Sequence, residues 1–518
     1  MRLKWNKSFK FMTRFTVILI ILNTLRNTYR KHLTKFDSVE HSTLLTDSSI
    51  RERVSFNRLN VSQLKKCTDR ITLNYKFLNV TSSCKAAVFP SHLARKPSWR
   101  AADKNNQSYV FSAYVLRKKR QIVIVGITQE GSSKYYCQIW NQNFGRQNMK
   151  MEEEPAKVVT LPEGRSLRYV TAQVVTLSTR EYNCKTYGIY STAQTVTCLA
   201  GHLLRYNAVL FQCMLPQSVE LPTHVSLVSR SCETPMNLLD IQYVRSPYVD
   251  KHRFTVCLSP LNFRYNRDYE IIEWVELNRI LGADKFIIYN YSSAINVARV
   301  LDYYSERGLT EVVQWNLPVG VDTWPRENKT VEIYYFGQIA ALHDCLYRNK
   351  GVSEFIVNLD VDEFIIPHGI NVTKWSDMLM QLKQDSNVYL FRNTFFKKEW
   401  NNVGIEIQNK SLVDKHRLVT LQKLQHETEI FSPRSRSKYF AKADGVFQVM
   451  IHEVPWMKNA YVPIEIGLLH HYRDWETRDD PPNVKVLDKT VPQKFGQLLI
   501  KNVQTVWSDL NIINNLRQ

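Results

Sequence analysis

The sequence predicts an α/β protein in which a doubly wound sheet forms the main domain, preceded by a β-rich N-terminal module and a short membrane anchor. Strand and helix patterns alternate from about residue 252 onwards, an order that favours a parallel sheet with helices on both faces. Short β-rich runs broken by turns precede this region, and a basic segment followed by an apolar one begins the chain.

The N-terminus has the composition of a targeting signal. Five basic residues precede the apolar stretch 15–25, as in the n-region and h-region of a signal sequence. The stretch is short for a spanning helix of about 20 residues, but no small-residue cleavage site follows it. We expect a cytosolic tail at 1–14, an uncleaved signal-anchor at 15–25 and a stem at 26–100, which gives a single-pass type II topology. A cleaved secretory signal is the alternative.

Other features agree with the secretory route. Seven N-x-S/T sequons follow the anchor, and the nine cysteines form no C-x-x-C pair, so disulfides in an oxidising compartment suit them better than zinc. The formal charge of +21 would suit a polyanion. We find no Lys/Arg-rich block beyond 117–120 and no zinc-finger or helix-turn-helix pattern, so we expect a diffuse basic surface and no nucleic-acid partner.

Two regions of regular structure are expected after the stem. A β-rich accessory module is predicted at 101–250, with strands at 109–116, 121–127 and 208–213. The doubly wound domain is predicted at 251–485, and a C-terminal tail helix at 486–518. No G-x-G-x-x-G motif follows any strand and no Walker lysine motif is present, so a dinucleotide-binding site is not predicted.

The pattern of the main domain gives its elements in order. Strands are predicted at 254–258, 285–289, 311–315 and 354–360, and the helices between them at 269–281, 295–307 and 333–348. A helix at 374–383, a strand at 388–392, a loop at 393–404 and a hairpin of 438–442 with 447–451 follow. Cys257 and Cys345 fall on a strand and the third helix, where they either pair or are core thiols.

The most informative motif is the acidic tetrad Asp360-Val361-Asp362-Glu363 at the end of the strand 354–360. Ligands of open α/β sheets bind beyond the carboxyl ends of the strands. Two carboxylates there make a hard-oxygen site for a divalent cation, and strand alternation would point Asp360 and Asp362 the same way. The alternative is an ordinary acidic turn.

Several stretches over roughly 250–475 resemble glycosyltransferase family 92, a nematode-expanded group of type II membrane enzymes with a GT-A-like domain: Val256–Pro260, Glu276–Tyr289, Gly337–Cys345, Asp360–Phe364, Ser437–Tyr439 and His471–Arg473. The resemblance implies inverting transfer of a hexose, with galactose expected, from a UDP-sugar to an acceptor glycan, forming a β linkage. It also implies a Golgi or secretory-pathway membrane location with the catalytic domain in the lumen.

The resemblance implies roles for single residues. Asp360 and Asp362 would hold Mn²⁺ or Mg²⁺, which acts as Lewis acid on the diphosphate. His471 matches the late histidine of the family as a third ligand, with His470 as the alternative register. The nucleotide-sugar would contact Asp360 and four more residues: Pro260, Gln338, Lys438 and Arg473. For each of these four an ordinary structural or solvated role is the alternative.

Inversion requires a base for the acceptor hydroxyl. We predict Glu399, beside Trp400, which could stack on a sugar. Glu363 and Asp474 are rivals, and Glu399 could instead form salt bridges with the lysines next to it. Two other functions stay open: a secreted metal-dependent hydrolase or phosphodiesterase, which would want a denser His/Asp array, and an inactive glycan-binding protein of the same fold.

Overall fold

The computed structural model describes residues 90, 92–93, 98–129, 135–140, 169–176, 204–215, 221–230, 233–243, 252–322, 330–382, 385–400, 405–455, 457–474 and 485–516. The expected cytosolic tail, the signal-anchor 15–25 and nearly all of the stem lie outside these residues. Within them we find no helix that combines the length and the apolarity needed to cross a bilayer.

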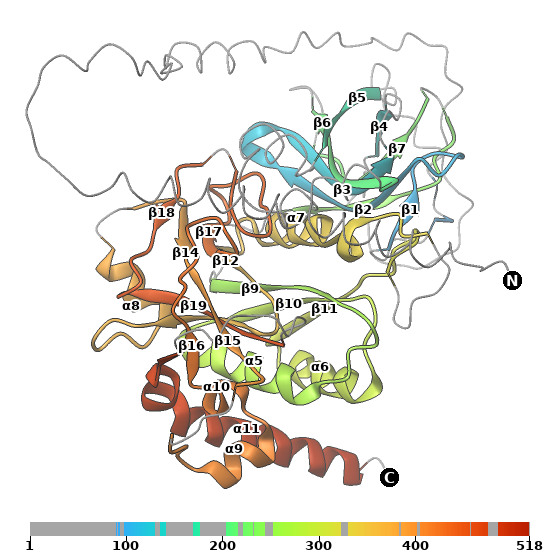
Figure 1. Cartoon of the computed structure of the whole chain (residues 1–518). Helices are drawn as coiled ribbons and strands as arrows, with labels where there is room; N and C mark the ends of the chain where they lie inside the picture. Colours follow the sequence, from blue (N-terminus) through green and yellow to red (C-terminus); the bar gives the residue numbers. More distant parts are fainter. Residues whose placement is uncertain are drawn as a thin grey trace, which may run out of the picture. The chain divides into compact units, whose positions relative to one another are not determined.

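The first part of the described chain forms an eight-stranded sheet (Figure 1). Its order is β1-β2-β3-β6-β5-β4-β7-β8, and it closes on itself because β8 pairs with β2 as well as with β7. The disulfide Cys137–Cys213 joins β4 to β6. The strands are β1 Arg100–Ala101, β2 Ser108–Leu116, β3 Gln121–Gln129, β4 Tyr135–Trp140, β5 Tyr169–Thr176, β6 Tyr206–Met214, β7 His224–Val228 and β8 Leu239–Tyr243, with a 3₁₀ turn, η1, at Arg117–Lys119.

A seven-stranded sheet follows, with the order β11-β10-β9-β12-β17-β14-β18. Its first four strands are parallel, and β17 runs antiparallel to both β12 and β14. Together with the helices that connect them, these strands make a mixed α/β fold. The strands are β9 His252–Leu261, β10 Lys285–Asn290, β11 Thr310–Gln314, β12 Ser353–Leu359, β14 Val388–Phe391, β17 Lys438–Lys442 and β18 Ala460–Tyr461.

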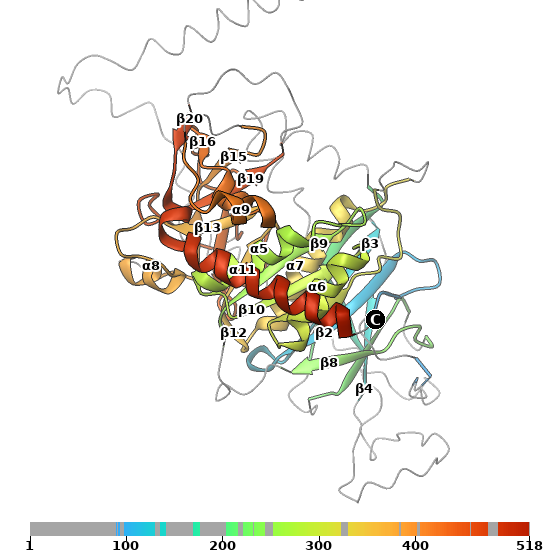
Figure 2. The same ribbon diagram turned by 90° about the horizontal axis from the view of Figure 1, so that it is seen from below.

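Helices cover both faces of this second sheet, as the strand–helix alternation predicts. The helices α5 (Asp268–Leu281) and α6 (Ile295–Glu306) lie on one face with the long C-terminal helix α11 (Thr490–Leu516), which packs along α5 (Figure 2). Helix α7 (Gln338–Asn349) covers the other face. Helix α5 ends where predicted, because Gly282 adopts φ 112° and its N–H caps the last turn.

Helix α7 also packs against strands β2, β3 and β6, so it lies between the two large sheets (Figure 1). We predicted a β-rich module at 101–250, and its strands are present. The inner side chains of the closed sheet form a core of their own, while β2, β3 and β6 also share a hydrophobic core with α7 and the second sheet. The disulfide Cys257–Cys345 ties β9 to α7, which settles the choice left open for these two cysteines.

Two small sheets complete the fold. In the first, β19 (Gly467–Arg473) lies between β13 (Glu363–Pro367), to which it is antiparallel, and β15 (Asn393–Lys397), to which it is parallel. In the second, β16 (Gln425–Glu427) pairs with β20 (Lys485–Leu487). The remaining helices are α8 Trp375–Gln381, α9 Lys410–His416 and α10 Val419–Gln422.

Two predicted elements have other bounds or another structure than expected. The third helix begins at Gln338 rather than at 333, because Tyr335, Phe336 and Gly337 have positive φ and form a 3₁₀ turn, η2 (Tyr334–Gly337). The predicted loop 393–404 begins with the buried strand β15.

The predicted hairpin after β17 is absent, since residues 447–451 form no strand. Strand β17 already has a partner on each side. The buried Lys350 Nζ donates to the carbonyls of Ala443 and Val446, both at 2.6 Å. These two bonds fix the backbone after β17 in a turn that does not lead back along the strand.

A buried carboxylate joins the two large sheets to α7. Asp344, which is fully buried, accepts hydrogen bonds from the hydroxyl groups of Ser112, Tyr114 (2.7 Å) and Tyr289 (2.6 Å). Arg348 donates to the same carboxylate at 3.0 and 3.2 Å. These donors come from β2, β10 and α7, so one charge holds three elements together.

We predict that Asp344→Asn lowers the free energy of unfolding by about 3 kcal/mol or more, because it removes the buried counter-ion of Arg348. Denaturant unfolding of the two proteins measures the difference. The control is Glu311→Gln, which removes the other partner of Arg348, 2.8 Å away but 44% exposed, and should cost less than about 1 kcal/mol. Equal effects of the two substitutions would contradict this assignment.

The neighbouring His343 makes the fold sensitive to acid. Its Nδ1 donates to Ile339 O (2.8 Å) and its Nε2 accepts from the Val449 N–H (3.3 Å). Burial lowers the pKa of His343 from 6.5 to about 4. Because the folded-state pKa is the lower one, the unfolded chain binds the proton first, and stability is lost as the pH falls from 6.5 to 4.

We predict that His343→Gln, which can keep both hydrogen bonds, removes roughly 3 kcal/mol from the acid-dependent loss of stability in this window. The measurement is the free energy of unfolding at a series of pH values. His252→Gln, at the start of β9, is the control and should leave the wild-type slope in place. An unchanged slope in His343→Gln would rule out His343 as the titrating group.

Candidate functional site

The acidic tetrad lies where the chain reverses direction across the central sheet. From β9 the chain passes through β10 and β11 on one side, and it returns to β12 on the other side of β9. Such a reversal leaves a crevice at the carboxyl ends of the two central strands, where ligands of α/β proteins bind. Ser259 and Pro260 lie near the end of β9, and Asp360 directly follows β12.

The tetrad forms a tight turn and does not continue the strand. The Glu363 N–H donates to Asp360 O (3.1 Å), and the Asp360 N–H donates to Glu363 Oε2 (2.9 Å). Strand alternation therefore does not apply to Asp360 and Asp362, which contact different partners. Their side chains are 33% and 27% exposed, whereas that of Glu363 is 1% exposed. The two aspartates thus face solvent, and the glutamate braces the turn from inside.

A buried lysine from β17 is the counter-ion of this turn. Lys438 Nζ lies 2.9 Å from Asp360 Oδ2 and 3.0 Å from Glu363 Oε2, and its side chain has no exposed surface. Burial raises the pKa of Asp360, but the Lys438 ammonium and a hydrogen bond from Ser259 have the larger effect. The pKa of Asp360 therefore lies well below its ordinary value. Burial lowers the pKa of Lys438, but Asp360 and Glu363 bring it above the ordinary value. Both groups are therefore charged.

His471 is the second cation at the turn. It lies opposite Glu363 in the β13–β19 pair, with Nε2 3.3 Å from Asp362 Oδ2 and Nδ1 3.4 Å from Glu363 Oε1. Burial lowers the pKa of His471, but the carboxylates, Asp362 first, raise it above the ordinary value. For Asp362 burial raises the pKa, and His471 brings it below the ordinary value.

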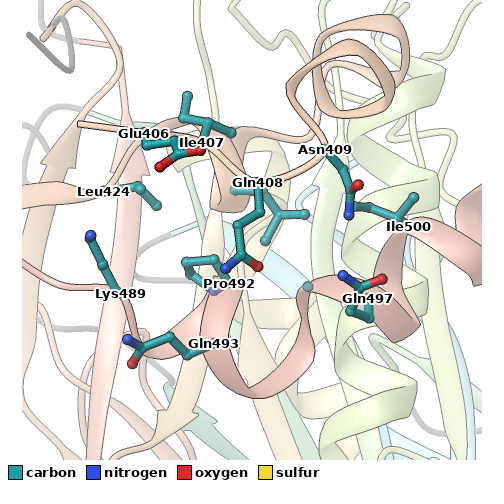
Figure 3. Close-up of a pocket in the computed structure, with 12 residues that line it drawn as sticks. Glu406, Ile407, Gln408, Asn409, Leu424, Lys489, Pro492, Gln493, Gln497 and Ile500 are labelled. Atoms are coloured by element: carbon teal, nitrogen blue, oxygen red, sulfur yellow. The ribbon is translucent and has the colours of Figure 1, made fainter. Parts of the chain in front are cut away.

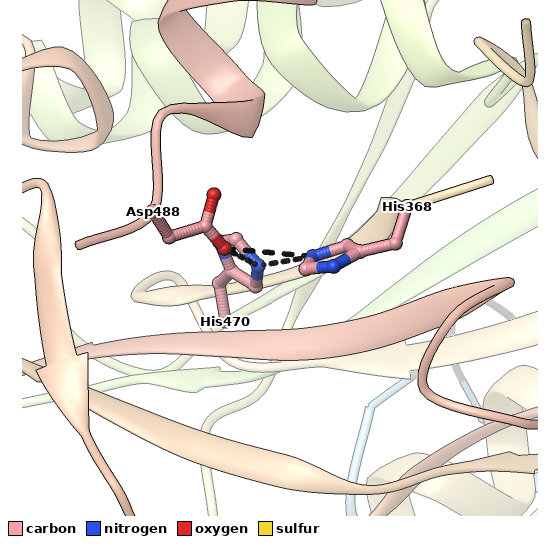
Figure 4. Close-up of side chains that lie close together, drawn as sticks. All are labelled: His368, His470 and Asp488. Carbon is pink, nitrogen blue, oxygen red and sulfur yellow. Dashed lines mark hydrogen bonds and ion pairs between the residues drawn. The ribbon is translucent and has the colours of Figure 1, made fainter. Parts of the chain in front are cut away.

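The two adjacent histidines point to opposite faces of β19. His471 faces the tetrad, whereas His470 Nε2 lies 2.8 Å from His368 Nε2 (Figure 4). Of the two registers considered from the sequence, the structure therefore has His471 at the tetrad. The reason is the alternation of side chains along an extended strand.

These residues fit a divalent cation. Asp360 and Asp362 offer partly exposed carboxylate oxygens, and His471 offers an imidazole nitrogen, a donor set suited to Mn²⁺. The buried Nδ1 of His471 has no hydrogen-bond partner. If Nε2 bound a metal, the Nδ1–H would face Glu363 Oε1, which is the usual support of a histidine ligand by a carboxylate.

Gln338 is linked to Asp360, whereas no hydrogen bond among the described residues joins Pro260 to it. Gln338, the first residue of α7, donates from Nε2 to Ser259 Oγ (2.7 Å), and Ser259 in turn hydrogen-bonds Asp360. Gln338 therefore acts on Asp360 through Ser259. Pro260 is buried, and its carbonyl accepts from Asn262 Nδ2 (3.2 Å).

Two arginines lie near the ring of Phe395, which contacts His471, and the sequence analysis named only one of them. The guanidinium carbons of Arg473 and Arg436 lie 5.8 and 5.3 Å from the ring centre of Phe395, which itself lies 4.9 Å from the His471 ring. Burial and the neighbouring Arg473 lower the pKa of Arg436. Arg436 could have been found from the sequence, because it lies two residues before Lys438, at the start of the strand β17.

Tyr335 and Lys398 were also missed. Tyr335 is 50% exposed, and burial and the Asp360 charge raise its pKa to about 12. Lys398 Nζ lies 3.1 Å from Glu270 Oε1 and 3.5 Å from Asp474 Oδ2. Burial lowers the pKa of Lys398, but Glu270, Asp474 and the more distant Asp362 raise it above the ordinary value. The sequence gives no signal for Tyr335, because only the fold of η2 brings it near Asp360.

Glu399 is exposed and acts electrostatically on Lys423. Among the contacts of the described residues, none joins Glu399 to the tetrad. The ring of its neighbour Trp400 has the ammonium groups of Lys485 and Lys397 at 4.8 and 5.3 Å from its centre. The roles predicted for Glu399 and Trp400 stay predictions.

A separate pocket of about 190 Å³ lies between the segment 406–409, α10 and α11 (Figure 3). The side chains at its mouth are mostly amides and apolar groups, among them Gln408, Gln493, Gln497 and Ile500. It shares no lining residue with the tetrad and its partners.

Two proteins of Caenorhabditis elegans are similar to this chain. One is beta-1,4-galactosyltransferase galt-1, 24% identical over 214 residues, which are 39% of this chain and 47% of that protein. The other is glycosyltransferase family 92 protein F13G3.3, 28% identical over 113 residues, or 22% of each protein. The chain thus spans less than half the length of either relative.

Among solved structures, glucosyl-3-phosphoglycerate synthase from Mycobacterium tuberculosis in complex with Mn²⁺, UDP and glucosyl-3-phosphoglycerate is 14% identical. The match covers 50% of this chain and 80% of that one, with a TM-score of 0.22. A TM-score at that level is too low to assign a common fold.

The family model described as glycosyltransferase family 92 matches residues 252–511, which are half of the chain. The matched segment begins with β9 and includes the tetrad, Lys438, His471 and nearly all of α11. The resemblance found in the sequence is confirmed, and the chain belongs to glycosyltransferase family 92.

Proposed function

We propose that this protein is a metal-dependent glycosyltransferase with a GT-A-like catalytic domain. It moves a hexose, with galactose expected, from a UDP-sugar to an acceptor glycan with inversion, forming a β linkage. The main support for the proposal is that Asp360, Asp362 and His471 lie close together where the chain reverses direction across the sheet, between β9 and β12. The similarity to a beta-1,4-galactosyltransferase supports galactose as the donor sugar.

Asp362, Asp360 and His471 would hold the cation. A bound Mn²⁺ or Mg²⁺ supplies the positive charge that makes a nucleoside diphosphate a good leaving group. Lys438 keeps the Asp360 carboxylate ionised and holds it close to Glu363. Gln338 and Ser259 fix the Asp360 carboxylate from the side of β9.

Two arginines would receive the donor phosphates. Arg473 and Arg436 present their guanidinium groups at the ring of Phe395, which lies next to His471. A guanidinium group binds two phosphate oxygens at once. Lys438 is fully buried and already paired with two carboxylates. Its contribution to phosphate binding is therefore indirect, through the charge it adds to the site.

An exposed carboxylate is needed as the base. Glu363 is a poor candidate, because it is 1% exposed and paired with Lys438 and His471. Asp474 is exposed but paired with Arg267 and Lys398. Glu399 is exposed in the loop after β15, so it is our candidate for the base.

The secretory location is part of the proposal. The basic and apolar N-terminal segments favour a type II signal-anchor. The disulfides Cys137–Cys213 and Cys257–Cys345 support an oxidising compartment such as the lumen of the Golgi.

We predict that Asp362→Asn lowers metal-dependent release of UDP from a panel of UDP-sugars by at least about 100-fold, because the neutral amide is a weak metal ligand. Secretion and the circular dichroism spectrum should be unchanged. The control is Asp302→Asn, at an exposed position of α6, which should keep full activity.

The same panel with and without Mn²⁺ and acceptor separates the possible functions. A transferase releases UDP in a way that requires metal and is stimulated by acceptor. Release that ignores the acceptor would indicate a hydrolase, and no release with any donor would indicate a glycan-binding protein. Full activity of Asp362→Asn would refute the metal site.

We further predict that Glu399→Gln lowers kcat by about 10²–10⁴-fold, as expected for loss of a general base, and leaves the KM for the UDP-sugar unchanged. Glu406→Gln, at an exposed position after the same loop, is the matched control. If both variants keep the wild-type kcat, Glu399 is not the base.

A further inference from the structure

Three metal-ligating side chains from distant segments meet on the face of β19 that points away from the tetrad (Figure 4). His368 directly follows β13, His470 lies within β19, and Asp488 directly follows β20. Their side chains are 19%, 1% and 7% exposed. Neither the family assignment nor the proposed transferase mechanism gives these residues a role.

The three donor atoms have the spacing of a tetrahedral metal site. His368 Nε2 and His470 Nε2 are 2.8 Å apart, and Asp488 Oδ2 lies 3.6 and 3.4 Å from them. Zinc bonds of about 2.0–2.1 Å at tetrahedral angles place neighbouring ligand atoms about 3.3 Å apart. One cation could therefore contact all three atoms once it replaces the hydrogen bond between the two imidazoles, which would move slightly apart.

Thr490 holds the Asp488 carboxylate with both its side chain and its backbone N–H. Asp488 Oδ1 accepts from the Thr490 N–H at 2.7 Å, which fixes the carboxylate. Oδ2 faces the two imidazoles at distances longer than normal hydrogen bonds. A cation at Oδ2 would offset the cost of burying this carboxylate.

The ammonium group of the nearby Lys494 is engaged in other hydrogen bonds. Lys494 Nζ donates to the carbonyls of Pro367, Gly369 and Val372 at 3.0, 2.8 and 3.1 Å. These three bonds use the three donors of the ammonium group. They also fix the backbone on both sides of His368, so this histidine is held in place before any ion binds.

We propose that His368, His470 and Asp488 form a second, structural metal site that binds Zn²⁺. Two imidazoles and a carboxylate suit zinc, and a water molecule completes the tetrahedron. The ion would tie the end of β13 and the middle of β19 to the start of α11, which packs along α5. Because His470 and His471 occupy opposite faces of β19, this site is independent of the proposed catalytic metal.

The test is metal binding by the full-length protein after chelation and dialysis. Added Co²⁺ should give the visible absorption of a tetrahedral site with one equivalent bound, and purified protein that has not been chelated should contain one equivalent of zinc. His368→Gln and Asp488→Asn should each weaken Co²⁺ binding by more than about 10-fold, because loss of a group that only supports a ligand already costs about 10–100-fold. Circular dichroism checks that both variants are folded.

The matched control is Asp362→Asn, which should keep the cobalt absorption even though it lacks the tetrad ligand. This variant separates the buried site from the proposed transferase site, so either can fail alone. The proposal is overturned if wild-type protein gives no tetrahedral cobalt spectrum and contains no zinc. It is also overturned if the spectrum is lost in Asp362→Asn but retained in His368→Gln.

Discussion

The candidate site depends on one buried ammonium group. Asp360, Asp362 and Glu363 place three carboxylates within one turn, and their mutual repulsion would push the pKa values up and the side chains apart. Lys438 bridges Asp360 and Glu363 from inside, and His471 bridges Asp362 and Glu363 from the side. The two aspartates therefore stay ionised while their free oxygens face solvent, which is the state that a divalent cation requires.

Helix α7 connects this turn to the remainder of the fold. Its first residue, Gln338, reaches Asp360 through Ser259. Further along, Asp344 collects donors from both large sheets, and Cys345 forms a disulfide with β9. The same helix thus positions the end of β9 against the end of β12 and anchors the closed N-terminal sheet. This arrangement explains why the β-rich region shares a hydrophobic core with the sheet that carries the site.

Strand β19 gives the fold two chemically different faces. His471 faces the solvent-accessible carboxylates, whose oxygen-rich set suits Mn²⁺ or Mg²⁺. His470 faces His368 and Asp488 in the interior, where a nitrogen-rich set suits zinc. A shift of register by one residue would exchange the two histidines. The pairing of β19 with both β13 and β15 fixes that register on each side.

The sequence by itself determined the parallel strands, the connecting helices and the position of the tetrad, because hydrophobic periodicity and glycines at helix ends are local signals. It also supplied the family, through motifs whose order matters. Only the tertiary structure decided which histidine meets Asp362, that Cys257 pairs with Cys345, that 393–397 is a strand, and that Arg436, Tyr335 and Lys398 lie near the site. These facts depend on strand register and on contacts between segments far apart in the chain, which no local pattern encodes.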